Sequence, residues 1–262
     1  MGIIENLLKP TPFYKFYNKY KQEKVNLAHQ KQEEELMPLR VEFYKNFINP
    51  GDTVFDVGAN VGNRVEAFLQ CEAKVIAVEP QPSCVEILTN KFGNRLTIEN
   101  VGLNDTIGEL EMQIANDSTV SSFNKDYINK TKERFKYSKW EKTIKVQVTT
   151  LDNLIIKHGV PKFCKIDVEG FELQVLKGLH TKIPFISIEY CVPEMENQNI
   201  ECLKYLNSLD NEALYNYSIG ESMKWALTDW MKFDEFMKHV ESKDFTRTSF
   251  GDIYIKSSAE VL

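Results

Sequence analysis

Short apolar runs alternate with amphipathic stretches along most of the chain. The amphipathic stretches have the spacing of helices with one apolar face, at residues 63–71, 83–92, 151–157 and 171–179. The apolar runs are rich in β-branched and aromatic residues, as buried strands are, and lie at residues 54–57, 74–78, 96–99, 163–168 and 184–190. Alternation of strand and helix predicts a mostly parallel central sheet with helices on both faces, that is, a Rossmann-like α/β fold.

The pattern changes at residue 108. Residues 109–115 and 143–149 alternate apolar and polar positions, which predicts two antiparallel strands. They flank a polar segment, residues 116–140, that contains aromatic side chains. We therefore expect a β-rich insertion at about 108–150, after the third strand. It would form either a substrate lid or a solvated surface loop.

The ends of the chain complete the predicted domain. A helix at 200–209, strands at 215–219 and 252–256 and a helix at 233–240 extend the sheet and its covering. Before residue 49, an aromatic and basic stretch (12–24), a polar run (30–35) and a helix at about 39–48 predict a helical N-terminal extension. We favour packing of this extension on the domain over a membrane-surface or partner-binding role. The expected division is residues 1–48 and 49–262.

Residues 54–62 (VFDVGANVG) join the first strand to a helix. Asp56 stands where the apolar strand ends, and Gly58 and Gly62 allow a sharp turn and close approach of a ligand. The spacing, with Asn60 between the glycines, differs from the G-x-G-x-x-G of dinucleotide sites. A carboxylate here repels a pyrophosphate but suits an ammonium group, which favours S-adenosylmethionine over NAD. A plain strand-to-helix connection would have similar glycines.

Glu79 ends the second strand, where a βαβ unit places an acid that binds ribose hydroxyls. Ser83 and Glu86 have the spacing of a capping box at the start of the next helix. Asn100 and Val101 leave the third strand at the sheet edge beside the expected cofactor base, so they are candidates for an adenine pocket or form a simple turn.

Composition narrows the partners. A chain of 262 residues with 42% apolar residues supports one large domain, and its net charge of −6 argues against nucleic acid as the main partner. The five cysteines show no C-x-x-C pair, and no apolar run is long enough to span a membrane. We expect reduced thiols and a cytoplasmic location.

Four motifs together resemble the FkbM family of S-adenosylmethionine-dependent methyltransferases. They are DVGANVG from Asp56, VEP ending at Pro80, TLDN from Thr150 and, most specifically, KIDVEGFE from Lys165. The resemblance implies a class I methyltransferase fold and O-methylation of hydroxyl groups on natural products, glycans or related metabolites. It implies that Asp56, Gly58, Asn60 and Gly62 hold the methionine part of the cofactor and Glu79 its ribose. Asp167 and Glu169 would flank the sulfonium and the acceptor. One departure is Gly102, where relatives commonly have alanine.

An alcohol needs a base, or a cation that lowers its pKa, before it can accept a methyl group. Asp167, Glu169 and Glu189 lie at or just past the carboxyl ends of predicted strands, where ligands bind in open α/β sheets. Either one of these acids is the general base, or the three hold Mg²⁺ or a similar divalent cation. The sequence leaves both routes open.

Two other functions share parts of this pattern. A catalytically silent S-adenosylmethionine-binding partner subunit would keep Asp56 and Glu79 but show damage in residues 165–172, which are intact here. An NAD-dependent oxidoreductase would require the other glycine spacing. We expect a small-molecule or glycan acceptor. The sequence does not define the acceptor, the position methylated or the oligomeric state.

Overall fold

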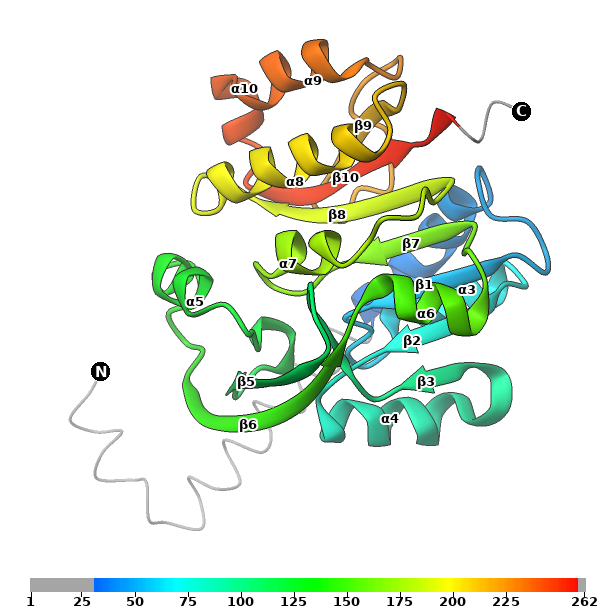
Figure 1. The fold of residues 1–262 in the computed structure, drawn as a ribbon, viewed down its shortest axis with the longest axis vertical. Coiled ribbons are helices and arrows are strands. Elements are labelled where there is room, and N and C mark those ends of the chain that lie inside the picture. The colour runs from blue at the N-terminus through cyan, green and yellow to red at the C-terminus, as the bar shows by residue number, and fades with distance from the viewer. Residues whose placement is uncertain (1–30, 259–262) are drawn as a thin grey trace.

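The computed structural model describes residues 31–258 and contains a seven-stranded central sheet (Figure 1). The strand order is β3-β2-β1-β7-β8-β10-β9; the first five are parallel to one another, and β10 is antiparallel to both β8 and β9. The order turns back at β1, where ligands bind in doubly wound sheets. The strands are β1 (Thr53–Val57), β2 (Lys74–Val78), β3 (Thr97–Glu99), β7 (Phe163–Ile166), β8 (Phe185–Cys191), β9 (Leu214–Ile219) and β10 (Phe250–Lys256).

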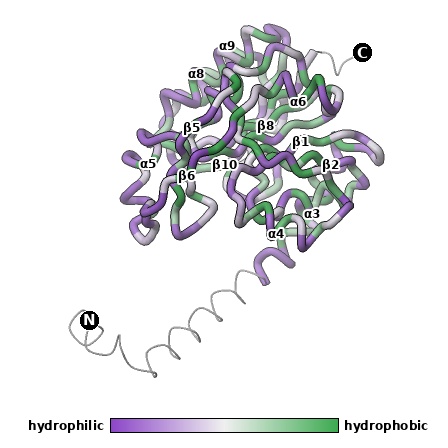
Figure 2. The backbone as a smooth tube through the Cα atoms, turned by 60° about the horizontal axis from the view of Figure 1, so that its bottom comes forward, coloured by the Kyte–Doolittle hydropathy of each residue, from purple (hydrophilic) through white to green (hydrophobic). Residues whose placement is uncertain are grey.

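Helices cover both faces of this sheet. Successive side chains of a strand point to opposite sides, so the apolar strands bury side chains on each face. In β1, for example, Val54 packs into one buried cluster and Phe55 into the other. Figure 2 shows hydrophobic segments concentrated in the central strands and a largely hydrophilic region around α5 and β6. The cluster that contains Val54 lies under α3 (Asn63–Gln70), α4 (Pro82–Phe92) and the helical residues 31–44. The cluster that contains Phe55 lies under α6 (Leu151–His158), α7 (Glu172–Lys177), α8 (Glu196–Leu209), α9 (Phe233–Val240) and α10 (Lys243–Thr246). The expected Rossmann-like α/β fold is confirmed.

The insertion forms a second sheet of three strands beside the first (Figure 1). β5 (Gly108–Ala115) pairs antiparallel with β6 (Trp140–Thr149), as the alternating pattern predicts. The sequence analysis missed β4 (Gly102–Leu103), which is parallel to β6, because two residues carry no periodicity. It also missed α5 (Lys125–Thr131), whose start is capped by the Asn124 side chain.

Other elements differ from expectation near their ends. The helix expected at 39–48 covers residues 31–44 and so includes the end of the polar run at 30–35. The stretch at 12–24 lies outside the described residues. Phe43 and Tyr44 from this helix are buried in the core, with edge-to-face contact between their rings. The division at residue 48 stays a prediction.

The predicted capping box before α4 is wrong. The helix begins at Pro82, and no side chain caps it. Proline suits the first helical position because it has no N–H to leave unpaired. The N–H of Gln81, the residue before it, donates instead to the Glu79 carboxylate at 2.7 Å.

Candidate functional site

A cavity of about 630 Å³ opens at the carboxyl-terminal edge of the sheet, within the size range of small-molecule sites. The ends of β1, β2 and β7 contribute to its walls, and so do the insertion, the helical residues 31–44 and the segment after β9. Segments from the whole length of the described chain therefore surround one space. The predicted site residues among its lining are Asp56, Gly58, Asn60, Glu79, Asp167, Glu169 and Glu189.

Asp56, within β1, is 2% exposed, and its Oδ2 atom has no hydrogen-bond partner among the described residues. Burial raises the pKa of this carboxyl to about 6, against the opposing charges of Lys165 and Arg64. A buried carboxylate oxygen without a hydrogen-bond donor is costly, and Asp56 is one of the residues that line the cavity. This fits a cationic group, such as an ammonium, bound beside β1.

Gly58 has a positive φ of 85° and lies against the chain that follows β7. A Cβ atom there would be 1.8 Å from the carbonyl oxygen of Asp167. The turn after β1 and the loop after β7 can approach this closely only because Gly58 has no side chain. The glycine thereby brings the predicted cofactor turn next to the predicted catalytic acids.

Glu79 is 2% exposed at the tip of β2, and backbone N–H groups hold both of its oxygens. Oε2 accepts from Asn60 N at 2.8 Å and Oε1 from Gln81 N at 2.7 Å. Burial raises the pKa of the carboxyl to about 7, although these hydrogen bonds lower it. The fixed carboxylate can still accept hydrogen bonds from ligand hydroxyls through its remaining lone pairs.

Three predicted cofactor residues are absent from the cavity lining in the described part of the chain. Gly62 faces α4, where a Cβ would meet Phe92 at 2.4 Å, so this glycine allows helix packing. The Asn100 amide donates to the carbonyl oxygen of Glu79 at 2.9 Å and so supports the turn after β2. Neither Asn100 nor Val101 lines the cavity, and their adenine-pocket role stays a prediction.

Asp167, Glu169 and Glu189 each offer a carboxylate oxygen, and these three atoms lie within 4.8 Å of one another. All three residues are partly buried. Burial, followed by the charge of Asp167, raises the pKa of both Glu169 and Glu189 well above the usual range. Three acids from β8 and the loop after β7 thus meet at one point of the cavity wall.

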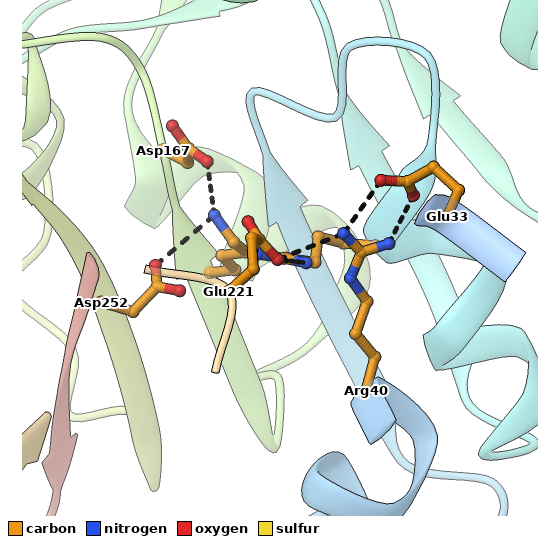
Figure 3. A network of polar contacts seen from close by, with 7 residues as sticks. Glu33, Arg40, Asp167, Glu221 and Asp252 are labelled. Atoms are coloured by element: carbon orange, nitrogen blue, oxygen red, sulfur yellow. Dashed lines mark hydrogen bonds and ion pairs between the residues drawn. The ribbon is translucent and has the colours of Figure 1, made fainter. Parts of the chain in front are cut away.

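Each acid of this cluster has a different environment. Asp167 Oδ2 lies 2.6 Å from the buried Lys165 Nζ, which is also 3.6 Å from Asp252 (Figure 3). Glu169 accepts a hydrogen bond from the Tyr127 hydroxyl of the insertion. The Glu189 side chain has no hydrogen bond or ion pair within residues 31–258. Glu189 is therefore the least stabilised carboxylate of the three.

The insertion is attached to the loop that carries Glu169. The Ser122 hydroxyl donates to the carbonyl oxygen of Glu169 at 2.7 Å, and the Asn124 amide donates to that of Gly170. A Cβ on Gly170 would meet the Tyr127 side chain at 2.5 Å. These contacts place Tyr127 at the site. The sequence analysis noted this tyrosine only as part of an aromatic segment, because no local pattern pairs residue 127 with residue 169.

Arg40, Arg64 and Glu221 also line the cavity and were not predicted. They form an ion-pair network with Glu33 (Figure 3). Arg64 follows the glycine turn in sequence, so a basic residue at the start of α3 was a signal that could have identified it. Arg40 and Glu221 are distant in sequence from every motif.

The sheet order and the buried acids at the ends of β1 and β2 define a protein of the Rossmann-like methyltransferase class. Residues 56–244 match the family described as the Methyltransferase FkbM domain. The chain belongs to this family, as its motifs indicated.

Curated relatives match over shorter stretches. The chain is 29% identical over 146 residues to the hexuronic acid methyltransferase AglP of Haloferax volcanii, over 55% of this chain and 56% of that protein. It is 40% identical over 52 residues to a probable ribosomal RNA small subunit methyltransferase A of Methanosarcina mazei, over 20% of this chain and 19% of that protein. The matches thus span about half the length of these relatives or less.

Among solved structures, a TehB-like SAM-dependent methyltransferase from Corynebacterium glutamicum aligns with a TM-score of 0.46 at 11% identity, over 92% of this chain and 97% of that chain. Within residues 31–258, no helix has both the length and the apolar character needed to cross a membrane. All five cysteines are buried with free thiols.

Proposed function

We propose that the protein is an S-adenosylmethionine-dependent methyltransferase that methylates a hydroxyl group on a glycan or small metabolite. The observation that carries this proposal is the meeting of Asp167, Glu169 and Glu189 in one cavity with the turn after β1. Family membership supports the class of reaction. The acid cluster supports an acceptor that must lose a proton.

The residues around the turn fit the cofactor. Asp56 has a buried, unpartnered oxygen that would bind the ammonium of the amino-acid end. Glu79, held by two backbone N–H groups, would accept hydrogen bonds from the ribose hydroxyls. When bound, S-adenosylmethionine would supply a methyl group that its sulfonium has already activated.

The chain's own task is then to orient an acceptor hydroxyl and take its proton. Asp167 has a lysine counter-charge at 2.6 Å, which fixes the position of its carboxylate. Glu169 already accepts a hydrogen bond from Tyr127, whereas the Glu189 carboxylate has no hydrogen-bond partner in the described chain and is free to accept one from the acceptor hydroxyl. We assign the proton to Glu189, and to Asp167 and Glu169 the orientation of the hydroxyl.

A divalent cation such as Mg²⁺ is the second route. The three carboxylates provide oxygen ligands of the kind that Mg²⁺ prefers. Lys165 Nζ already lies 2.6 Å from Asp167, however, so one of the three acids has a counter-charge without a metal ion. The direct route is therefore our proposal, and a chelator distinguishes the two.

The acceptor class rests on one relative. The printed name of the Haloferax volcanii protein describes methylation of a hexuronic acid, which supports a sugar acceptor here. The exclusion of nucleic acid and the cytoplasmic location stay predictions.

Calorimetric titration with S-adenosylhomocysteine, with NAD as the control ligand, tests the proposal first. One-site binding of the first compound alone is expected, and binding of neither would refute the cofactor assignment. Transfer of a labelled methyl group to sugar glycosides and uronic acids is then measured with and without a chelator. Asp167→Asn should bind the cofactor product but lose transfer, whereas Asp105→Asn, on an exposed loop, should retain both. Binding with no transfer to any acceptor would favour the silent partner subunit.

A further inference from the structure

A short segment at the end of α5 and before β6, residues 130–139, carries a strong positive charge. It contains five basic residues and one acidic residue, a net charge of +4. The rest of the chain has 27 basic and 37 acidic residues, a net charge of −10. Because the two signs are separated in this way, the segment presents a positive potential on a protein that otherwise repels anions.

Two of these five bases are paired with acids. Lys130 Nζ lies 2.8 Å from the Asp126 carboxylate, and Arg134 Nη2 lies 2.7 Å from that of Glu194. The other three are exposed and have no ion pair within residues 31–258, and we call them the basic rim: Lys132, Lys136 and Lys139. Their charge is therefore available to a ligand.

The basic rim borders the cavity, because the segment is fastened there. Arg134 and Phe135 lie between the lysines in sequence, and both line the cavity that contains the three acids. Arg134 Nη1 donates to the Ser249 hydroxyl at 2.7 Å, and Nη2 donates to the carbonyl oxygen of Val192 at 2.9 Å. Since consecutive Cα atoms are about 3.8 Å apart, lysines within a few positions of these anchored residues lie at the edge of the cavity.

The acids of the cavity decide where a negative charge of the acceptor can lie. Oxygen atoms of Asp167, Glu169 and Glu189 lie within 4.8 Å of one another. An anionic group beside the reacting hydroxyl would add a fourth acid to this cluster, which is unfavourable. At the basic rim the same group is attracted. An acceptor with its negative charges on units next to the reacting one fits both parts of the surface.

We propose that the acceptor is an acidic glycan chain. Its negatively charged sugar units bind Lys132, Lys136 and Lys139, while a hydroxyl of another unit reaches the three acids. This inference rests on the proposed function, because it names the class of acceptor for the same site.

Two other polyanions fit this surface less well. A membrane surface requires apolar side chains beside the bases, and within residues 130–139 the exposed large apolar side chain is Tyr137 alone. A single nucleic acid strand is held by aromatic rings on which its bases stack. Trp140 is not free for stacking, because its indole N–H donates to the carbonyl oxygen of Val120 at 2.8 Å and its ring packs against the cluster around Tyr127.

A competing explanation is that the lysines only keep the insertion in solution. It predicts that the basic rim affects ligands no more than other exposed lysines do. Lys177, Lys204 and Lys243 provide the matched comparison, because they are exposed on α7, α8 and α10 and are absent from the cavity lining.

Fluorescence anisotropy with labelled oligosaccharides tests the proposal. The probes are oligomers of galacturonic acid and neutral oligomers of galactose of the same length. The wild-type protein should bind the acidic oligomer at least about fivefold more tightly, and this preference should largely disappear when the salt concentration rises from about 50 to about 300 mM. Equal affinity for the two oligomers at low salt would overturn the proposal.

A triple variant then tests the basic rim itself, with Lys132→Gln, Lys136→Gln and Lys139→Gln. It should weaken the acidic oligomer about eightfold, because each exposed ion pair contributes about a factor of two. Binding of the neutral oligomer and of S-adenosylhomocysteine should change by less than about twofold. The control variant, with Lys177→Gln, Lys204→Gln and Lys243→Gln, changes the net charge equally and should leave all three ligands within about twofold. Equal weakening by the two triple variants would refute a site at the basic rim.

Two rival probes complete the test. They are a labelled single-stranded RNA oligonucleotide and vesicles of phosphatidylserine and phosphatidylcholine. If either binds more tightly than the acidic oligomer and loses that binding in the basic-rim variant, the surface serves that polyanion and the glycan assignment is wrong.

These outcomes are distinct from failure of the proposed function. If the wild-type protein does not bind S-adenosylhomocysteine, the cofactor assignment is wrong, whatever the oligosaccharides do. If it binds that compound and shows no preference for the acidic oligomer, the proposed function stands and only the acidic acceptor is refuted.

Discussion

The proposed ribose role of Glu79 predicts that affinity for S-adenosylhomocysteine falls as the pH drops below 7, because in that proposal the ionised carboxylate accepts the hydrogen bonds of the hydroxyls. The Glu79 carboxyl is 2% exposed, and burial raises its pKa to about 7. Both of its oxygens already accept backbone N–H groups, so the protonated form would direct its O–H toward the ligand side. Protonation therefore removes an acceptor at the position where the ligand requires one.

The magnitude follows from the titration. With a pKa of about 7, roughly nine tenths of the carboxyl is ionised at pH 8 and roughly one tenth at pH 6. The Kd should therefore rise about tenfold between these two pH values. Asp56, whose pKa is raised to about 6, should make the dependence steeper at lower pH.

Stability of the ligand-free protein should move in the opposite direction. Burial raises the folded-state pKa of Glu79 from its ordinary value of 4.5 to about 7, so the folded protein binds more protons than the unfolded chain between these pH values. The stabilising contribution is fully present below pH 4.5 and is lost as the pH rises through about 7. Urea denaturation of the ligand-free protein at pH 5 and pH 8 measures it.

Calorimetric titration from pH 5.5 to 8.5 is the binding assay, with Glu79→Gln as the variant. Glutamine keeps the shape, but its NH₂ would face the N–H of Asn60 or Gln81, so binding should be weaker and nearly independent of pH between 8 and 6. Glu86→Gln, exposed on α4, is the matched control. A wild-type Kd that is constant from pH 8 to 6, or a variant with the wild-type slope, would refute the reasoning.

Three further substitutions test the packing of the site, each by urea denaturation. Gly58→Ala should lower the free energy of unfolding by about 3 kcal/mol or more, because the new Cβ would lie 1.8 Å from a carbonyl oxygen. Gly93→Ala, also at positive φ but with nothing within 4 Å of the new Cβ, should lower it by about 1 kcal/mol. Equal losses for the two variants would contradict the predicted clash. Lys165→Met should cost about 3–5 kcal/mol because it leaves two acids without their buried counter-charge, and a loss below about 1 kcal/mol would argue against the pairing. Tyr127→Phe should lower the free energy of unfolding by about 1.5–3 kcal/mol, because it removes the hydrogen bond to the Glu169 carboxylate. Tyr137→Phe, at a residue that is 83% exposed, should lower it by less than about 0.5 kcal/mol. Similar losses for the two variants would refute the contact between Tyr127 and Glu169.

Much of the fold could be predicted because its signals are local. The apolar run at residues 74–78 coincides with β2, and the helix predicted at residues 233–240 coincides with α9. Errors gather where a neighbour, rather than periodicity, decides the structure. β4 has two residues and exists only because β6 lies beside it, and no side chain caps α4, before which the Gln81 N–H donates to Glu79.

For the site, sequence alone determined the residues that follow strands. The carboxyl ends of parallel strands meet at one edge, so Asp56, Glu79 and Asp167 could be assigned to a common space before any coordinates. The family motifs indicated the same residues. Their burial, and hence the raised pKa of Asp56 and Glu79, depends on what covers them and was not accessible from the pattern.

Only the tertiary structure decided which other side chains complete the cavity. Arg40, Tyr127 and Glu221 come from a helix before β1, from the insertion and from the segment after β9, and no local pattern relates them to one another. Local sequence encodes periodicity over a few residues, because secondary structure depends on neighbouring backbone positions. A hydrogen bond between residues 127 and 169, or an ion pair between residues 40 and 221, depends on the path of the whole chain. Those contacts are defined only when the sheet, its helices and the insertion pack together.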